Sequence, residues 1–163
     1  MIERTLVLLK PDCVQRHITG EIISRFEKAG LKIVGMKMVW CDKEQAMKHY
    51  TEDVAKRRGE FVRNKLLVGI TQGPIVAMCL EGIEAVDVVR KIVGSTEPKT
   101  APPGTIRGDY AHMSYDYADS SNKAIPNIVH ASGNKEEAKQ EIDLWFKPEE
   151  LHSYKLPHEY HIQ

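Results

Sequence analysis

Apolar positions in the first part of the chain change from a continuous run to a helical spacing. Residues 5–9 form a short apolar run that the segment 10–12 interrupts, as expected of a buried strand that ends at a functional rim. Between residues 19 and 29 the apolar side chains recur with helical spacing, and Gly30 stands where a left-handed cap is favoured. The pattern predicts a strand followed by a helix.

The next segment repeats the same order of elements. Residues 31–40 alternate between apolar and polar positions and include β-branched side chains, which predicts a second strand. Asp42 and Gln45 resemble a capping box that opens a helix running toward Tyr50. The segment 51–70 is charged and mixed, and we expect further helix and loop there.

The second half begins with another buried strand, at 74–80, and an amphipathic helix at 83–93 that Gly94 closes. Prolines and a glycine make 95–105 a long irregular loop, and 110–126 is a second irregular stretch, polar and aromatic. Both are loops of the kind that often carry function.

The last elements are a short strand at 127–130 and a helix that ends near Trp145, with Asn134 and Glu137 forming its capping box. Two β-α-β halves in this order predict an α+β fold, a ferredoxin-like antiparallel sheet (βαββαβ) with helices packed on one side. At 163 residues the chain is expected to form a single domain over 1–163.

Charge and composition limit the classes of partner. Lys and Arg together number 23, as do Asp and Glu, so no overall field favours nucleic acid or an anionic membrane. The start of the chain lacks a signal-peptide pattern and no run is long enough to span a membrane, which predicts a cytoplasmic protein. Cys13, Cys41 and Cys79 form no C-x-x-C pair and are expected to be reduced thiols without a chemical role.

An anionic ligand must therefore be held by local cations. The chain has neither a G-x-x-x-x-G-K-[ST] loop nor a G-x-G-x-x-G after a strand, so side chains must bind any phosphate. Candidates are Lys10 after the first strand, Arg90 late in a helix, Thr96 in the first long loop, and Arg107. Each of them taken alone is more often a surface residue.

His130 stands between a predicted strand and a capped helix, a favourable place for a nucleophile that accepts a phosphoryl group. The chain has seven histidines, however, and a lone histidine at a strand end is more often packed or exposed. His152, His158 and His161 lack metal-ligand spacing, which argues against a metal hydrolase built on the tail.

A series of motifs changes this balance. In chain order they are ERT to KPD (3–12), GEII and RFE (20–27), HY (49–50), GP (73–74), EG (81–82), PGTIRGD (103–109), NIVHAS (127–132) and LWFKPEEL (144–151). Over essentially the full length the chain resembles the nucleoside diphosphate kinase family, and so many motifs in one order are highly specific.

The resemblance implies a nucleoside-diphosphate kinase, a phosphotransferase that moves the terminal phosphate of a triphosphate to a diphosphate. His130 matches the histidine that is phosphorylated in a ping-pong cycle, and Glu141 the carboxylate that fixes its tautomer. Tyr50 matches a tyrosine near the transferred phosphate, and Ser132 the serine beside the histidine.

The resemblance also implies the nucleotide contacts. Lys10, Arg90 and Arg107 match the cations that clamp the phosphates, Thr96 matches a hydroxyl donor, and Asn127 with Lys10 the pair that binds the ribose. Magnesium would accompany the triphosphate. The base is only sandwiched between side chains in the family, so its identity should matter little.

Two regions depart from the family pattern. The segment between Tyr50 and Gly73 is longer than usual and lacks a plain Phe-Phe-x-x-Leu signature. Phe61 with Leu66 is the best substitute for the base contact, and Val62 aligns as well. Extra residues between 109 and 130 form either a surface excursion or a lid or subunit contact.

Two single positions also differ, since His17 replaces a usual glycine and Gly133 a usual aspartate. By resemblance the chain is a homo-oligomer, a tetramer or a hexamer. A second class of function, a nucleotide-binding protein that has lost turnover, has no physical need to keep the whole set of matching site residues.

Overall fold

A computed structural model describes residues 1–157 and 159. Its strands are β1 (Ile2–Leu9), β2 (Lys32–Trp40), β3 (Pro74–Ile83) and β4 (Val129–Ala131). Its α-helices are α1 (Pro11–Gln15), α2 (Thr19–Lys28), α3 (Lys43–His49), α4 (Glu52–Arg58), α5 (Glu60–Thr71), α6 (Ala85–Val93), α7 (Ile106–Tyr110), α8 (Tyr115–Ser120) and α9 (Lys135–Trp145). Short 3₁₀ turns lie at η1 (Pro98–Thr100) and η2 (Pro148–Glu150).

The four strands form one antiparallel sheet in the order β2-β3-β1-β4. The central strand β1 pairs along its whole length with β3, from Ile2 opposite Ile83 to Leu9 opposite Val76. On its other side it pairs with the short β4, where Leu8 lies opposite His130. This order confirms the predicted α+β, ferredoxin-like class, and it carries His130 to an edge of the sheet.

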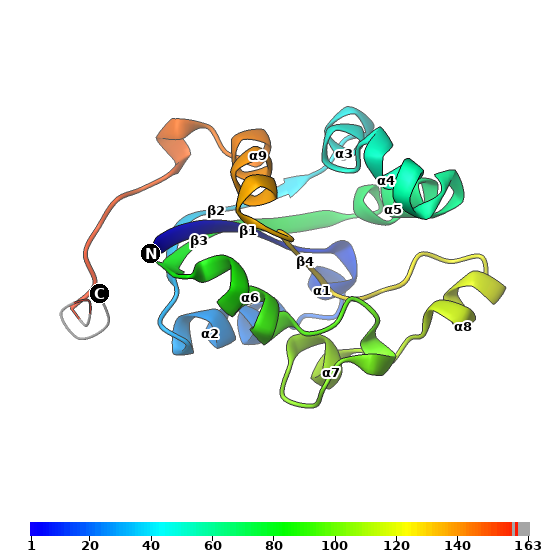
Figure 1. Cartoon of the computed structure of the whole chain (residues 1–163), viewed down its shortest axis with the longest axis horizontal. Coiled ribbons are helices and arrows are strands. Elements are labelled where there is room, and N and C mark those ends of the chain that lie inside the picture. Colours follow the sequence, from blue (N-terminus) through cyan, green and yellow to red (C-terminus); the bar gives the residue numbers. More distant parts are fainter. Residues whose placement is uncertain (158, 160–163) are drawn as a thin grey trace.

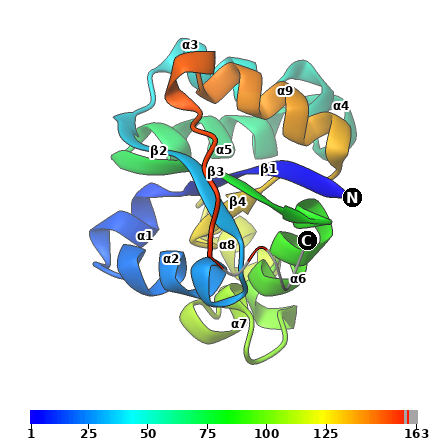
Figure 2. The same ribbon diagram turned by 90° about the vertical axis from the view of Figure 1, so that its left-hand side faces the viewer.

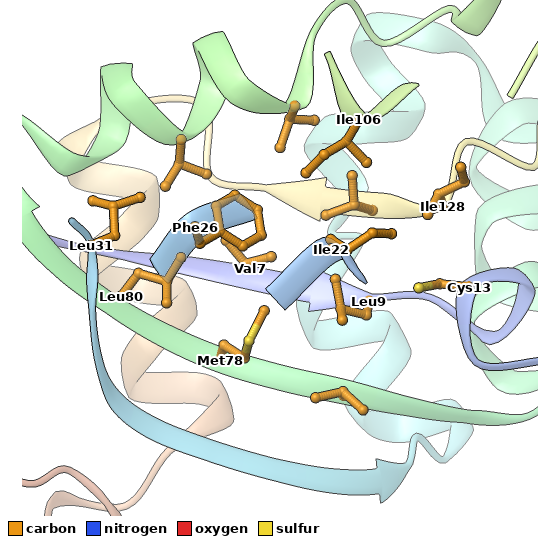
Figure 3. Close-up of a cluster of buried hydrophobic side chains, with 14 of the residues drawn as sticks. Val7, Leu9, Cys13, Ile22, Phe26, Leu31, Met78, Leu80, Ile106 and Ile128 are labelled. Atoms are coloured by element: carbon orange, nitrogen blue, oxygen red, sulfur yellow. The ribbon is translucent and has the colours of Figure 1, made fainter. Parts of the chain in front are cut away.

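Helices cover both faces of the sheet, not one as the sequence pattern suggested (Figure 1). Because side chains alternate along a strand, Val7 and Leu9 enter one core while Leu6 and Leu8 enter the other. The first core contains residues of α2, α6 and α7, and Figure 3 shows Phe26 against Val7 within it. The second core packs α3, α5 and α9 on the opposite face. A continuous apolar run, as in β1, is the sequence pattern expected of a strand that is buried on both faces of the sheet.

Most predicted helix ends agree with the structure, but Ile83, expected to open a helix, is the last residue of β3, and α6 begins at Ala85. Asp42 accepts a hydrogen bond from the amide of Gln45 (2.8 Å), and Asn134 accepts one from that of Glu137 (2.9 Å). Gly30 has a φ of 83°. His17 also has a positive φ, 58°, which accounts physically for the glycine usual at that position.

The two segments that differ from the family pattern, between Tyr50 and Gly73 and between 109 and 130, both contain helices. The stretch 110–126, predicted to be irregular, contains α8, which Ser114 caps by accepting from the amide of Tyr117 (3.2 Å). In the other segment Gly59, with a φ of 90°, separates α4 from α5. Buried Arg63 donates from Nε to the carbonyl of Tyr50 (2.8 Å), which ties α5 to the end of α3. The six residues of α8 show too little periodicity to be found by pattern, whereas helix within 51–70 was expected.

After η2 the chain runs along the outer strand β2, as Figure 2 shows. The amide of His152 donates to Val34 (2.7 Å) and the Tyr154 hydroxyl to the carbonyl of Ile33 (2.5 Å). His158 and His161 lie outside the described residues, as does the end of the predicted domain. The three cysteines are free and buried. Within the described part of the chain, no helix combines the length and the apolar character needed to cross a bilayer.

Candidate active site

An open cleft of about 750 Å³ lies beside the end of β4. In Figure 1, α4 and α5 lie above this strand end, and α7 and α8 below it. Most of the residues predicted from the sequence line the cleft, namely Lys10, Tyr50, Arg90, Thr96, Arg107, Asn127, His130 and Glu141. The fold therefore brings together side chains from separate elements and loops that are far apart in the sequence.

A strained turn delivers His130 to the cleft. Ile128 has a φ of 71°, rare for a β-branched residue, and the amide of Val129 donates to the carbonyl of Asn127 (2.8 Å), which closes a γ-turn. The amide of Ile128 is held by the carboxylate of Asp12 (2.9 Å). Such strain costs on the order of 1–3 kcal/mol and is typical of functional sites. The predicted strand 127–130 is thus a turn followed by a true strand from Val129.

Glu141 orients the imidazole. His130 Nε2 lies 2.8 Å from Glu141 Oε1, and the Ser132 hydroxyl donates to Glu141 Oε2 (2.6 Å). Ser132 itself is fully buried and supports the carboxylate from behind rather than lining the cleft. With the proton on Nε2 for the carboxylate, Nδ1 keeps its lone pair.

The carboxylate of Glu141 stays charged at neutral pH. Burial by itself would raise the pKa of Glu141, but the charge of His130 and the hydrogen bonds from His130 and Ser132 lower it to about 2. His130 therefore has a permanent anionic partner on α9.

Arg107 is anchored through its whole guanidinium. Its Nε donates to the carbonyl of Asn127 (3.3 Å), Nη1 to that of Gly94 (3.0 Å) and Nη2 to that of Val129 (2.6 Å). Burial lowers the pKa of Arg107 to about 10, so it remains a cation at neutral pH. The side chain both charges the cleft and ties the two long loops to β4.

The other polar residues of the cleft wall come from several elements. Desolvation lowers the pKa of Lys10, an effect that Asp12 opposes and Arg107 reinforces. The Asn127 side chain donates to the carbonyl of Thr96 (2.9 Å), joining the two loops beside Arg90. Lys10, Arg90 and Arg107, with Lys48, Arg57 and Arg58 elsewhere in the lining, make the cleft a site for an anion with several charges.

Tyr50 closes the inner wall. It follows α3 directly and is almost completely buried. Burial raises the pKa of Tyr50, and the charge of Glu141 raises it further, so that the phenol stays neutral. A neutral hydroxyl here is a hydrogen-bond donor at physiological pH.

Phe61 lies away from the cleft. Its side chain is 55% exposed and is absent from the cleft lining. The ring packs under the ammonium of Lys65 (4.1 Å to its centre), which also pairs with Asp119 of α8 (3.5 Å). Val54 and Leu66 instead supply the apolar part of the wall on this side.

One neighbour of His130, His49, was not singled out by the sequence pattern beyond its place in a family motif. It lies buried beside His130, with ring centres 4.5 Å apart. His49, His130 and Glu141 could each offer one atom to a metal ion, and these atoms lie within 4.8 Å of one another. His130 and Glu141, however, already share a hydrogen bond. His49 follows buried Ala46 by three residues, and this helical spacing is the signal that places His49 on the inner face of α3.

Comparison with known proteins gives a consistent result. The family model described as nucleoside diphosphate kinase matches residues 3–151. The nucleoside diphosphate kinase of Pyrococcus furiosus is 55% identical over 153 residues, with 94% of this chain and 88% of the relative covered. That of Borreliella burgdorferi is 44% identical, with 95% and 93% covered.

Solved structures agree with the sequence relatives. A transition-state mimic of the nucleoside-diphosphate kinase from Borrelia burgdorferi, with bound vanadate and ADP, superposes with a TM-score of 0.97 at 42% identity, covering 99% of this chain and 96% of the other. A halophilic enzyme from Halobacterium salinarum in complex with CDP gives 0.84 at 37% identity, with 98% and 97% covered. By its fold, its sequence relatives and the family model that spans nearly all of it, this chain belongs to the nucleoside diphosphate kinase family.

Proposed function

We propose that this phosphotransferase moves the terminal phosphate of a nucleoside triphosphate to a nucleoside diphosphate through a phosphohistidine on His130. The observation that carries the proposal is the bond between His130 Nε2 and Glu141 (2.8 Å) in a cleft lined by Lys10, Arg90 and Arg107. A fixed, carboxylate-supported imidazole facing clustered cations suits the transfer of an anionic phosphoryl group.

The reaction consists of two matched displacements. In the first, the lone pair of Nδ1 of His130 attacks the terminal phosphorus, an N–P bond forms, and the bond to the bridging oxygen breaks so that the diphosphate leaves. In the second, a terminal oxygen of the acceptor diphosphate attacks the same phosphorus and the N–P bond breaks. Glu141 balances the positive charge that the imidazole gains when it is phosphorylated.

The cations stabilise the charge that spreads over the phosphoryl oxygens in the transition state. Arg107 is suited to this task because its bonds to three backbone carbonyls fix its position before the substrate arrives. Tyr50 is proposed to donate its hydroxyl near the transferred phosphate, and Thr96 to donate beside Arg90. Asn127 and Lys10 are assigned to the ribose.

Mg²⁺ is proposed to enter with the triphosphate as part of the substrate. The carboxylates in the cleft lining already have partners, since Asp53 pairs with Arg57, Glu137 accepts from the amide of Gly133, and Glu141 holds His130. Phosphate oxygens are therefore the ligands left for the ion, which adds charge neutralisation to that of the cations.

The substrate is proposed to be any of the common nucleotides. On the side of α4 and α5, the cleft wall offers the apolar side chains of Val54 and Leu66 beside the charged Asp53, Arg57 and Arg58. Asp53 and Arg57 pair with each other (2.7 Å), and apolar contact discriminates weakly between bases. Specificity constants for purine and pyrimidine diphosphates should then agree within about tenfold. A much stronger preference would indicate hydrogen bonds to the base edge.

A homo-oligomer, tetramer or hexamer, is also proposed. Met36, Met38 and Trp40 alternate along the outer strand β2 and are 54%, 60% and 68% exposed, which supports a subunit interface there. Sedimentation velocity would test it, since a monomer at micromolar concentration contradicts it. A cytoplasmic location stays a prediction of the sequence.

The decisive experiment uses triphosphate labelled on its terminal phosphate. Native protein should take up acid-labile, alkali-stable label, His130→Ala should take up none, and His152→Ala, which removes an exposed histidine outside the cleft, should behave as native. Label on His130→Ala would refute the assignment. Nucleotide binding by native protein without any label would favour the second candidate, a binding protein without turnover.

A further inference from the structure

A second histidine is buried against the proposed phosphate carrier. The side chain of His49 has no exposed surface, and its ring meets the ring of His130 edge to face at 83°. The rings of Tyr50 and Trp145 meet it in the same manner, at centre distances of 4.7 and 5.6 Å. The side chain of His49 is therefore buried among three aromatic rings, one of them that of His130.

One hydrogen bond fixes the orientation of this ring. The indole Nε1 of buried Trp145 donates to His49 Nδ1 (3.2 Å). Because the indole nitrogen can only donate, Nδ1 must be the acceptor and Nε2 carries the proton of a neutral imidazole. Among the described residues Nε2 has no hydrogen-bond partner.

The unpaired Nε2 makes a simple packing role a poor explanation. A buried donor without a partner costs about 1–3 kcal/mol, and a phenylalanine would fill a similar volume without that cost. Buried polar groups left in this state require a reason. The Nδ1 acceptor, which phenylalanine lacks, is the part of the side chain that has a partner.

His49 also stays out of the charge balance of the site. Burial lowers the pKa of His49 to about 3, with His130 of β4 lowering it further and Glu141 of α9 opposing the effect. Glu141 Oε1 is 3.7 Å from His49 Nδ1 and 2.8 Å from His130 Nε2. Besides His130, the titratable group in ring contact with His49 among the described residues is Tyr50, which is also uncharged at neutral pH. Neither His49 nor Tyr50 therefore competes as a cation with His130 for the carboxylate of Glu141.

Helix α9 thus reaches the nucleophile by two routes. Glu141 bonds directly to Nε2 of His130. Trp145, one turn later on the same helix, donates to His49, whose ring lies against that of His130. A single hydrogen bond at Nε2 leaves the imidazole free to tilt about it. A fixed ring at right angles to it restricts that tilt.

We propose that His49 is a positioning residue that, anchored by Trp145, holds the ring of His130 in the orientation from which its free nitrogen attacks the phosphate. The proposal rests on the proposed role of His130 and adds a residue to it. Misplacement of a reacting group by about 1 Å can cost about 100-fold in rate, so a loosened ring should lower turnover and leave nucleotide affinity unchanged.

Two variants each break the hydrogen bond between Trp145 and His49. His49→Phe keeps an aromatic ring beside His130 but removes the acceptor for Trp145, and Trp145→Phe removes the donor but keeps His49. In single-turnover phosphorylation each should be about 10- to 100-fold slower, with nucleotide dissociation constants within about twofold of native. The double variant should be no slower than the slower single variant, because both changes break the same bond.

Ile142→Val is the matched control. Ile142 is buried on α9 beside Glu141 and packs in the same core as Trp145, without contributing to the hydrogen bonds described here. Its loss of a methylene should cost about 1 kcal/mol of unfolding free energy with an unchanged rate of phosphorylation. It shows what a purely structural defect in this core does.

A spectroscopic readout separates this proposal from the kinase assignment. In protein labelled with ¹⁵N-histidine, the ring nitrogens of His130 should give one sharp set of signals in the native protein and in Ile142→Val. In His49→Phe and Trp145→Phe they should be broadened or split by motion of the ring. This measurement needs no turnover, so it remains valid even if native protein takes up no label and the proposed function fails.

Sharp His130 signals with rates within about twofold of native in His49→Phe would overturn the proposal and leave His49 as packing. If His49→Phe does not fold, His49→Asn decides. Asparagine Oδ1 can still accept from Trp145 but provides no ring against His130, so a slow rate is expected. A rate within about twofold of native in that variant would equally overturn the proposal.

Discussion

The two ends of the cleft are built in different ways. At the phosphate end His130, Glu141 and Arg107 are largely buried, and each is in contact with more than one group of the protein. At the outer end, Val54 of α4 and Leu66 of α5 line the cleft. Behind this wall α5 is joined to α8 through the Lys65–Asp119 pair, in which the carboxylate is 64% exposed.

The difference follows from what each end has to do. Transition-state stabilisation depends on groups that are fixed before the substrate binds, which requires burial and redundant bonds. Contact with a base depends mainly on apolar surface, which tolerates different side chains at the same wall. Substitutions should therefore have steep effects at the phosphate end and shallow ones at the outer end.

The largest effect is expected for Arg107→Ala. Turnover should fall by about 100- to 1,000-fold, as on removal of one preorganised donor. Since Arg107 also bonds the carbonyls of Gly94, Asn127 and Val129, unfolding free energy should drop by on the order of 3 kcal/mol. Steady-state kinetics and urea unfolding measure the two effects, and a fall in turnover of less than about tenfold would mean that Arg107 only supports the loops.

Glu141→Gln should come next, with phosphorylation of His130 about 100-fold slower because the imidazole loses its anionic partner. The variant also has a pH signature. The folded protein lowers the pKa of Glu141 from its ordinary value of 4.5 to about 2, so the unfolded chain binds the proton first as the pH falls. The stability from this charge is complete above about pH 4.5 and is lost toward about pH 2.

That contribution is on the order of 3 kcal/mol in native protein, and Glu141→Gln should lack its pH dependence. Urea unfolding of both proteins at intervals between about pH 2 and 5 measures the difference. Parallel stability curves in this range would mean that the carboxylate gains nothing from His130 in the folded state.

A smaller effect is expected at the outer wall. Leu66 lines the cleft and Phe61 does not, so Leu66→Ala should raise KM for nucleotide about tenfold, because the base would have less apolar surface to pack against. Phe61→Ala should leave KM within about twofold of the native value. The reverse order would restore Phe61 as the base contact inferred from sequence and would require α5 to rotate when nucleotide binds.

The smallest effect is expected for Asp119→Asn. The ion pair with Lys65 is long (3.5 Å) and its carboxylate is mostly exposed, so removing it should change unfolding free energy by less than about 1 kcal/mol. Thermal unfolding at low and high salt measures it. A larger destabilisation, reduced by salt, would show that α8 depends on this pair and that the outer wall is more rigid than its exposure indicates.

The strands, the caps of α3 and α9, and the phosphate-end residues could be predicted from the sequence. Continuous apolar runs and Asn134 or Asp42 before a helix act locally, so a pattern of a few residues suffices to detect them. The resemblance to a family supplied the roles of His130 and Glu141, because chemistry at this end allows few side chains.

Other features depended on contacts between distant segments. The cover of both sheet faces follows from where α2, α6 and α9 pack. Helix α8 could not be found by pattern because six residues carry too little periodicity. Phe61 lies outside the cleft on α5, a helix that buried Arg63 joins to the end of α3 by donating to the carbonyl of Tyr50.

By itself, the sequence determined the strands, the longer helices and the class of the fold, since those depend on local preference. Through its resemblance to a family it also indicated a phosphate-binding set. Only the tertiary structure decided which of these side chains share one cleft and which stand outside it. It alone brought His49, from α3, against His130, from β4, because ring contacts and burial arise when elements remote in sequence pack together.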